Sequence, residues 1–448
     1  MRLIDPEREA FSVLSERLAP SGPAPLGIAL SGGGDSVALL LMATAWARRH
    51  GRRVVAFTVD HQLHPESGRW TAAAGVAAVQ AGAQWRSLAW EGEKPAAGLP
   101  AAARAARHRL IAEAARAEGA AVILIGHTAD DVLEAGLMRA EGSTTPDPKI
   151  WSPSPAWPEG RGLFLLRPLL SVRRQALRDW LDRHGVAWIE DPGNADPRFA
   201  RSRARSRLTS DHIGDMPTPA VEPGEPIQSS STPDGRLMVE RADVGEGSHR
   251  FLAMALVCAA GGATPPRRPA LNRLLARLAS GEDFTAALGG ARIEADGRHV
   301  TFGREPGERT RGGLAATPVS PRAPTVWDGR FAIEAEVEGA IAPLAGRMAS
   351  LPRAERQALR SLPASARGAM PVFVDGAGEA RLPRPFGSAH ARAVSLVGAR
   401  LAGACGRIQR EGDIQARLSD NGAEGLGLLS WGSGLSDAGI CTGGEGRM

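Results

Sequence analysis

The sequence contains no tyrosine, and Lys94 and Lys149 are its only lysines among 448 residues. Aromatic residues make up only 4% of the chain, so its hydrophobic cores must rest mainly on Ala, Leu, Val and Ile. No stretch is long and apolar enough to span a membrane, and we expect no membrane partner. The N-terminal residues mix acids with apolar side chains, which is not the pattern of a signal peptide.

Cysteine is also scarce. Cys258, Cys405 and Cys441 are the only three, and none belongs to a CxxC pair. A disulfide framework and a zinc site are therefore not expected, and the pattern fits a protein of the reducing cytoplasm.

The formal net charge is +5, and arginine supplies nearly all of the positive charge. Arginine makes planar, bidentate contacts with phosphates, so a nucleic-acid partner is one interpretation. A general richness in Arg, Ala and Gly is the other, and charge alone does not decide between them.

Apolar β-type runs alternate with helical patterns between about residues 25 and 190. The expected strands are 26–30, 54–59, 85–89, 121–125 and 163–166, and the expected helices are 36–48, 68–81, 101–118, 128–139 and 172–184. This alternation predicts an α/β fold with a doubly wound, mostly parallel sheet, in which ligands bind at the carboxyl ends of the strands.

The remaining segments have weaker patterns. We expect a long loop over 143–162, which is rich in Pro and Trp. Helices over 251–260 and 269–278 and a hairpin over 291–302 predict smaller C-terminal α+β regions. The predicted divisions are a catalytic domain over 1–213, a linker over 214–245, an α+β region over 246–310, a β-rich region over 311–400 and a Gly-rich tail of low order over 401–448.

The strongest local signal lies directly between an expected strand and an expected helix, and consists of Ser31, Gly32, Gly33, Gly34, Asp35 and Ser36. The glycines let the backbone turn sharply towards an anion, and the following helix N-terminus presents free N–H groups. Asp35 would repel phosphates unless Mg²⁺ lay between them, so we expect Mg²⁺ there. An ordinary Gly-rich turn is the alternative.

The run is not a Walker A loop, because it lacks GK followed by Ser or Thr. SGGGDS instead resembles the PP-loop signature of the ATP pyrophosphatases, which adenylate a carbonyl oxygen and release pyrophosphate. The resemblance implies ATP as a cosubstrate and a doubly wound sheet.

The second expected strand ends in VDHQLHPES, residues 59–67. This run resembles the VDHGLRPES motif of the tRNA(Ile)-lysidine synthetases, with Gln62 in place of Gly and His64 in place of Arg. In this fold the end of the second strand lies where an adenine or ribose binds, which implies an ATP contact for Asp60. A polar strand-end loop is the alternative, and Gln62 makes the local backbone conformation a question for the structure.

A third run is GHTADDVLE, residues 126–134. Asp131 and Glu134 are three residues apart on an expected helix, so they share a face, and His127 precedes them by about one turn. The two carboxylates could hold a substrate ammonium group or share Mg²⁺ with phosphates, although acids at a helix start also favour the helix dipole. The run is similar to GHTADDQAET of the same family, which implies ATP contact for His127 and lysine binding for Asp131 and Glu134.

Two basic runs extend the resemblance. RAARH at residues 104–108 resembles the family's ARxxRY, with His108 for Tyr. The run from Glu190 resembles EDPSNxDxxFxRNRIR, with Ser202 replacing Asn. A solvated basic face is the alternative for each arginine. The contacts with tRNA or ATP implied by the resemblance are Arg104, Arg107, Asn194, Arg201 and Arg205.

The motifs cover about residues 25–207 and imply an ATP-dependent ligase. The family joins free L-lysine to C2 of the wobble cytidine in tRNA(Ile) with a CAU anticodon, which changes the codon read from AUG to AUA. Adenylation makes the C2 oxygen a leaving group, and the lysine ε-amine then attacks C2. The catalytic residues implied are Asp35, His127, Asp131 and Glu134.

Other functions remain open at this point. A PP-loop tRNA thiolase would need reactive cysteines, usually as CxxC pairs, and an ammonia-using synthetase would lack DHQLHPES and EDPGN. A catalytically inactive tRNA-binding protein would not need intact SGGGDS and ADDxxE sets.

Overall fold

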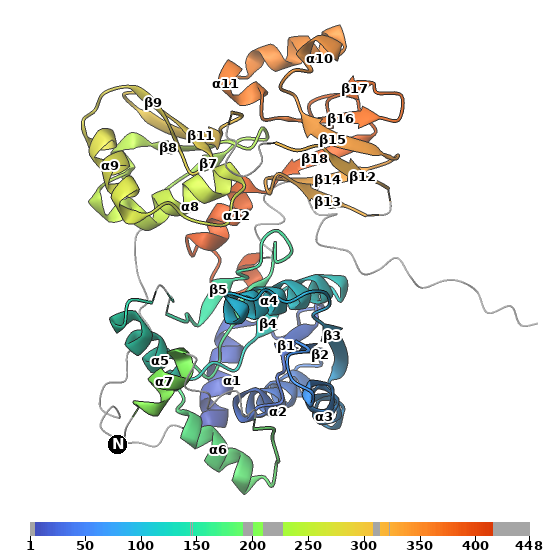
Figure 1. The fold of residues 1–448 in the computed structure, drawn as a ribbon, viewed down its shortest axis with the longest axis vertical. Helices are drawn as coiled ribbons and strands as arrows, with labels where there is room; N and C mark the ends of the chain where they lie inside the picture. The colour runs from blue at the N-terminus through green and yellow to red at the C-terminus, as the bar shows by residue number, and fades with distance from the viewer. Residues whose placement is uncertain are drawn as a thin grey trace, which may run out of the picture. The chain divides into compact units, whose positions relative to one another are not determined.

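The computed structural model describes residues 5–143, 145, 147–190, 200–208, 227–307, 314–321 and 323–414. The chain divides into two compact units. Unit 1 comprises Met1–Val221 and Gln409–Met448, and unit 2 comprises Glu222–Ile408. Figure 1 labels the helices and strands of each.

Unit 1 is built on a six-stranded sheet in the order β3-β2-β1-β4-β6-β5. Its strands are β1 (Leu26–Ala29), β2 (Val54–Asp60), β3 (Gln84–Ala89), β4 (Val122–Leu124), β5 (Trp151–Pro153) and β6 (Phe164–Leu166). β5 is antiparallel to β6, and the other neighbouring strands are parallel. The predicted doubly wound, mostly parallel sheet is confirmed. β1 lies between β2 and β4, so the strand order reverses there, and such sheets bind ligands outside the carboxyl ends of the strands at that point.

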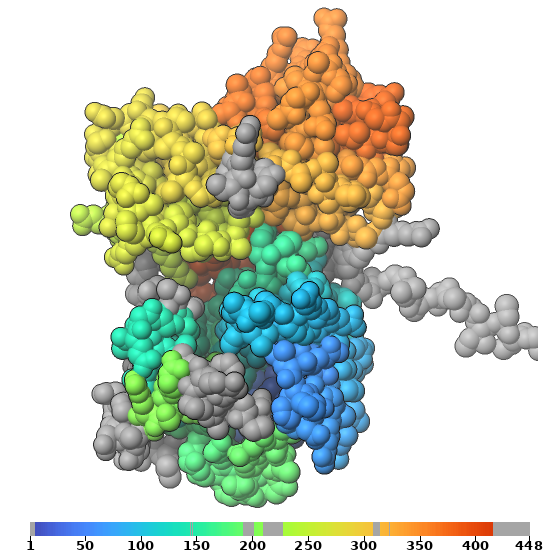
Figure 2. Space-filling view, viewed as in Figure 1, coloured from blue at the N-terminus to red at the C-terminus, as the bar shows by residue number. Residues whose placement is uncertain are grey.

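Helices cover both faces of this sheet. They are α1 (Pro6–Arg17), α2 (Gly34–Arg49), α3 (Ser67–Gln80), α4 (Leu99–Ala117), α5 (Ala129–Ala140), α6 (Arg174–Arg183) and α7 (Ala200–Ser206). Figure 1 shows α4 on one face and α1 and α2 on the other. Ile111 of α4 packs with Phe57 and Ile123 of the sheet. In the space-filling view the cyan atoms of α4 lie at the surface of unit 1 (Figure 2).

The first helix, α1, was not expected from the sequence, although its start carries a clear capping signal. Asp5 accepts a hydrogen bond from the N–H of Glu7 at 3.0 Å, and Pro6 occupies the first helical position. The helix is fixed to α2 by a bond from Trp46 Nε1 to Ser15 Oγ at 2.9 Å.

The prediction of an unstructured loop over 143–162 is wrong in its middle. β5 pairs with β6, and the ring of Trp151 stacks on Phe164 with centroids 5.2 Å apart. The strand is short and carries Pro153 at its end, so it has no alternating pattern long enough to read from the sequence.

The predicted linker over 214–245 is also wrong in its second half. β7 (Ser230–Ser231) and β8 (Leu237–Glu240) belong to a sheet of unit 2. Leu237 and Val239 are buried while their neighbours are exposed, which is the alternation of an ordinary half-buried strand. Proximity to the Pro-, Ser- and Thr-rich segment obscured this pattern.

The start of the predicted tail over 401–448 is folded. α12 (Val397–Ala404) extends into it, and residues 409–414 belong to unit 1. There Glu411 forms a buried ion pair with Arg52, at 2.7 Å between Oε2 and Nη1. Its Oε2 also accepts from the N–H of Ala19 at 2.9 Å. Residues 415–448 lie outside the described part of the chain.

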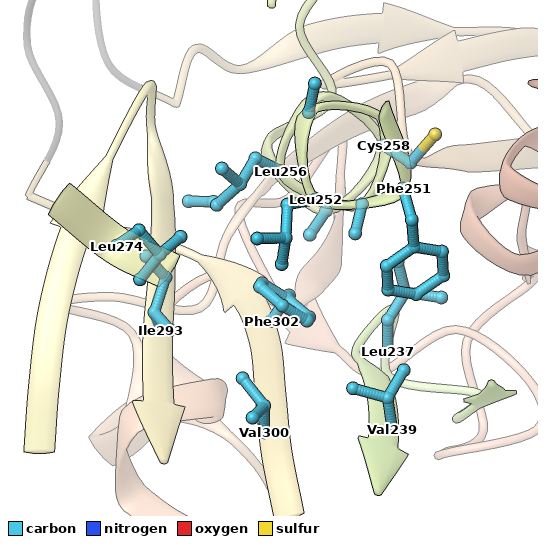
Figure 3. Packing of buried hydrophobic residues seen from close by; sticks show 14 of the residues in the cluster. Leu237, Val239, Phe251, Leu252, Leu256, Cys258, Leu274, Ile293, Val300 and Phe302 are labelled. Atoms are coloured by element: carbon cyan, nitrogen blue, oxygen red, sulfur yellow. The ribbon is translucent and has the colours of Figure 1, made fainter. Parts of the chain in front are cut away.

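Unit 2 contains the expected smaller α+β regions. Its first sheet has the order β7-β8-β11-β10-β9, with β9 (Phe284–Leu288), β10 (Ala291–Ala295) and β11 (His299–Arg304). α8 (His249–Ala260) and α9 (Arg268–Ala279) pack with this sheet. Leu252 of α8 points towards Phe302, as Figure 3 shows. The predicted hairpin is confirmed, since β10 and β11 pair antiparallel. In its turn, Asp296 Oδ1 accepts from the N–H groups of Arg298 and His299.

The second part of unit 2 has two further sheets. They follow the orders β12-β15-β16-β17 and β13-β14-β18. The strands are β12 (Thr317–Val319), β13 (Thr325–Trp327), β14 (Phe331–Ala335), β15 (Gly339–Pro343), β16 (Pro371–Asp375), β17 (Ala380–Arg381) and β18 (Ala391–Ser395), with the short helices α10 (Arg353–Ala358) and α11 (Ala364–Arg367). Across the described parts of both units, no helix combines the length and apolar character needed to cross a membrane.

Candidate active site

The phosphate loop connects β1 to α2. Gly32 has a φ of +84°, and a Cβ at this position would lie 2.6 Å from Cδ1 of Ile189, so glycine is required. Ser36 Oγ donates to the carbonyl of Gly33 at 2.8 Å and lies 3.1 Å from Ser31 Oγ. No side chain caps α2 at Gly33, which leaves the positive end of the helix dipole for an anion.

The loop that follows β4 lies directly against the first turn of α2. A Cβ at Gly126 would lie 2.9 Å from the carbonyl oxygen of Asp35, which makes glycine the residue that permits this approach. One guanidinium joins the two sides, because Arg174 Nε lies 3.0 Å from Asp35 Oδ2 and its Nη1 lies 2.9 Å from Glu134 Oε1. The phosphate loop and the acids of α5 therefore share one edge of the sheet.

Asp131 and Glu134 of α5 already form hydrogen bonds and ion pairs within the protein. Asp131 completes a capping box, accepting at Oδ2 from the N–H of Thr128 at 2.7 Å and from its hydroxyl at 2.8 Å. Glu134 is fully buried and accepts from Arg201 Nε at 2.8 Å and Arg205 Nε at 2.9 Å. Arg201 also bonds Asp131. Asp131 therefore stabilises the start of α5 and also contacts Arg201.

The chain has close similarity to curated proteins. Residues 7–212 match the family model of the PP-loop domain. A tRNA(Ile)-lysidine synthase of Caulobacter vibrioides is 45% identical over 407 residues, covering 89% of this chain and 98% of the relative. The chain belongs to the tRNA(Ile)-lysidine synthase family. A second member, from Hyphomonas neptunium, is 38% identical and covers 70% of this chain and 92% of the relative.

Among solved structures, the U34-tRNA thiolase NcsA from Methanococcus maripaludis with its [4Fe-4S] cluster matches with a TM-score of 0.38 and 16% identity. The match covers 47% of this chain and 74% of that chain.

His127 lies in the loop that follows β4, and its Nδ1 accepts from Arg167 Nε at 2.9 Å. Burial and the neighbouring Arg167 lower the pKa of His127 well below its usual value, so the imidazole is neutral. Because Nδ1 is the acceptor, the ring proton is on Nε2. Arg167 is itself fixed by the carbonyl of Lys149 at 2.6 Å and by Ser152 Oγ at 3.1 Å.

The family's basic motif on α4 forms a cluster with surplus positive charge. Burial, followed by the charges of Arg104 and Arg201, lowers the pKa of Arg107 to about 10. Burial and the adjacent arginines lower the pKa of His108 to about 3, and its Nε2 is buried without a hydrogen-bond partner. Cations that depress one another's pKa values in this way favour an anionic ligand.

The structure shows which backbone conformation Gln62 adopts in place of the family's glycine. Gln62 has a φ of +54°, the left-handed conformation that the family's glycine would adopt without strain. Its N–H donates to Asp60 Oδ1 at 2.8 Å, so Asp60 stabilises this turn. His64 stacks on Trp70 with ring centroids 4.7 Å apart. Both departures from the family motif therefore preserve a defined loop at the end of β2.

The structure adds Arg167 and Arg174, which were missed in the sequence. Arg167 directly follows β6 and Arg174 is the first residue of α6, in a stretch without a motif of recognisable chemistry. The available signal was the position of Arg167 just after a strand, at the edge of the sheet where ligands bind. Asn194 lies outside the residues that the structure describes, so its predicted contact stays a prediction.

Proposed function

We propose that this chain is an ATP-dependent ligase that joins free L-lysine to C2 of the wobble cytidine of tRNA(Ile) with a CAU anticodon. The product would read AUA in place of AUG, and ATP would yield AMP and pyrophosphate. Family membership supports the activity. The observation that carries it at residue level is the Arg174 guanidinium, which links Asp35 of the phosphate loop to Glu134 of the predicted lysine site.

The phosphate loop would receive the triphosphate. Ser31, Ser36 and the N–H groups from Gly32 to Gly34 would bind pyrophosphate oxygens, and Asp60 would contact ATP at the end of β2. The neutral His127, with its proton on Nε2, would donate a hydrogen bond to ATP. The attacking atom is the C2 carbonyl oxygen of the cytidine. The bond from the α-phosphorus to the bridging oxygen breaks, and pyrophosphate leaves.

The residues present fit Mg²⁺ in one arrangement. Within the described chain, no group of at least three His, Cys, Asp or Glu side chains could hold a metal ion by itself. Magnesium often takes one or two carboxylates and completes its shell with phosphate oxygens and water. Asp35, whose side chain is 25% exposed, is the carboxylate that would hold it. Bound there, the ion would neutralise charge on the phosphates.

The lysine substrate would bind beside the acidic side chains of α5. Asp131 and Glu134 would bind its ammonium group, and the guanidinium groups of Arg201 and Arg205 would give way to it. This exchange keeps the buried carboxylates paired at every stage, which avoids a costly uncompensated charge. Once displaced from the carboxylates, these two arginines of α7 would be available to neutralise phosphates of ATP or tRNA.

The tRNA would be held by positive charge and by unit 2. Arg104 and Arg107 would contact phosphates, and Asn194 would lie in the substrate site. Residues 246–310 and 311–400 would contribute tRNA contacts outside the catalytic unit. The cytidine must be presented unpaired, because the enzyme's reacting groups cannot reach a base that is paired within a duplex. Such a reaction belongs in the cytoplasm.

The two cysteines in the described part of the chain offer no support for a thiolase. Burial, as the largest effect, raises the pKa of Cys258 to about 12, and burial also raises the pKa of Cys405. Both thiols lie in unit 2 and are protonated at neutral pH, so neither is an activated nucleophile.

Labelled lysine tests the proposal. The protein is incubated with ATP, labelled lysine and tRNA(Ile) carrying CAU, with elongator methionine tRNA of the same anticodon as the matched control. We expect ATP-dependent label in tRNA(Ile) at a much higher rate than in the control. Absence of label from tRNA(Ile), or entry of sulfur in place of lysine, would refute the function.

A further inference from the structure

Arg174 reaches three of the carboxylates that the proposed function uses. Its Nε lies 3.0 Å from Asp35 Oδ2, its Nη1 lies 2.9 Å from Glu134 Oε1, and its Nη2 lies 3.6 Å from Asp131 Oδ2. The Arg174 side chain is only 13% exposed, so solvent screens these interactions weakly. We propose, on the basis of the ligase function above, that Arg174 is a positioning residue that holds the phosphate-side and lysine-side carboxylates in one array.

The backbone of Arg174 is fixed from two directions. Its N–H donates to Asp130 Oδ2 of α5 at 2.7 Å, and Arg173 Nη2 lies 3.1 Å from Asp130 Oδ1. Further along α6, Leu181 packs against the phosphate loop, with its Cδ1 3.5 Å from where a Cβ on Gly34 would lie. The guanidinium therefore extends from a helix that is attached to both α5 and the start of α2, as a positioning group requires.

The other guanidinium groups have a different place. Arg201 and Arg205 approach Glu134 from α7, and their side chains are 42% and 34% exposed. They are the cations that an incoming lysine ammonium can replace. Arg174 is less exposed and also pairs with Asp35, so it remains when they leave. Without Arg174, three neighbouring carboxylates would repel one another at the moment when lysine must be aligned with the adenylated cytidine.

This division of roles predicts a specific kinetic pattern. Misplacing a reacting group by about 1 Å can cost on the order of 100-fold in rate. Arg174→Gln should lower kcat for lysine transfer by about that factor and raise the KM for lysine, while ATP/PPi exchange in the presence of tRNA falls less. Arg174→Lys keeps the charge but not the fork geometry, so it should restore part of both constants.

The matched control is Arg178→Gln. It removes the same charge one turn further along α6, where Arg178 Nη2 lies 3.4 Å from Glu190 Oε1 and the side chain is 44% exposed. The test measures kcat and KM for lysine, together with ATP/PPi exchange, in the wild type and the three variants, with thermal melting as a check on folding. We expect Arg178→Gln to stay within a few-fold of the wild type.

The positioning role is overturned if Arg174→Gln matches Arg178→Gln in both reactions, or if only its melting temperature changes. Should Arg174→Gln not fold, Arg174→Lys decides, and wild-type constants for it would reject the role. A wild-type protein that transfers no lysine would defeat the proposed function itself, and the positioning role with it.

Discussion

The buried carboxylate of Glu134 combines a structural role with the proposed role in binding lysine. Its side chain is 1% exposed and is paired with Arg174, Arg201 and Arg205. Removing one member of a buried ion pair costs about 3–5 kcal/mol, because the remaining charge is left uncompensated. A test of its function must therefore keep the shape of the side chain and follow folding at the same time.

Glu134→Gln is the suitable change. It keeps the volume and one hydrogen-bond acceptor but removes the charge that a lysine ammonium needs. We expect the KM for lysine to rise at least about tenfold, in line with the 1.5–3 kcal/mol of a charged hydrogen bond, while the KM for ATP changes less. Steady-state kinetics with each substrate varied in turn measures this. Equal changes in the two KM values would contradict a lysine-binding role.

Asp35 is proposed to act in the other half of the reaction, the adenylation step. Asp35→Ala should abolish ATP/PPi exchange, because the phosphates would lose the carboxylate that holds their counter-ion. Circular dichroism should still show a folded protein, since the Asp35 side chain is partly exposed. An Asp35→Ala variant that exchanges pyrophosphate at the wild-type rate would remove this residue from the catalytic set.

His108 gives stability a dependence on pH. Its pKa is lowered to about 3 in the folded protein, against about 6.5 in an unfolded chain, so the unfolded state takes up the proton first as the pH falls. Stability should therefore decrease from pH 7 towards pH 3, by about 2 kcal/mol at pH 5 from this residue. His108→Tyr, the residue of the family motif, should show a smaller fall between pH 7 and pH 5 in denaturant titrations. Identical pH dependence in both proteins would disprove this assignment.

At the scale of elements, residues 409–414 stabilise unit 1 through the buried ion pair between Glu411 and Arg52. The Arg52 and Glu411 side chains are 1% and 2% exposed, and Arg52 also donates to the carbonyl of Ala24 at 2.6 Å. Glu411→Gln should lower the free energy of unfolding by about 3 kcal/mol, because it leaves a buried guanidinium unpaired. The double variant Arg52→Met/Glu411→Leu should recover most of this loss. Chemical denaturation measures the free energy of unfolding of both variants. A Glu411→Gln variant with the wild-type denaturation midpoint would be inconsistent with a stabilising role for this ion pair.

Elements with strong periodicity could be predicted from the sequence. β1, α2, β2 and α5 were expected close to their observed bounds. β5 and β8 were missed because each is short and adjoins a Pro-rich segment, where local pattern gives no sign of a distant pairing partner. The ion pair between Glu411 and Arg52 could not be predicted either, because the two residues are far apart in the sequence.

At the scale of the whole molecule, motif spacing predicted which residues meet but not how they are paired. The sequence places Asp35, Asp131 and Glu134 at strand ends and helix starts, and their shared edge follows from the parallel sheet. Pairing depends on Arg174, Arg201 and Arg205, which come from helices whose packing directions are set by tertiary contacts. Their convergence on Glu134 is a property of the folded chain.

The central claim is that this chain activates the cytidine through its C2 oxygen and then replaces that oxygen with lysine. An oxygen-isotope experiment tests it most directly. Transcribed tRNA(Ile) carrying ¹⁸O at C2 of the wobble cytidine is incubated with the protein, ATP and lysine, and the AMP released is analysed by mass spectrometry. The account predicts one ¹⁸O atom in AMP for each lysine incorporated. Lysine-modified tRNA formed alongside unlabelled AMP would contradict it.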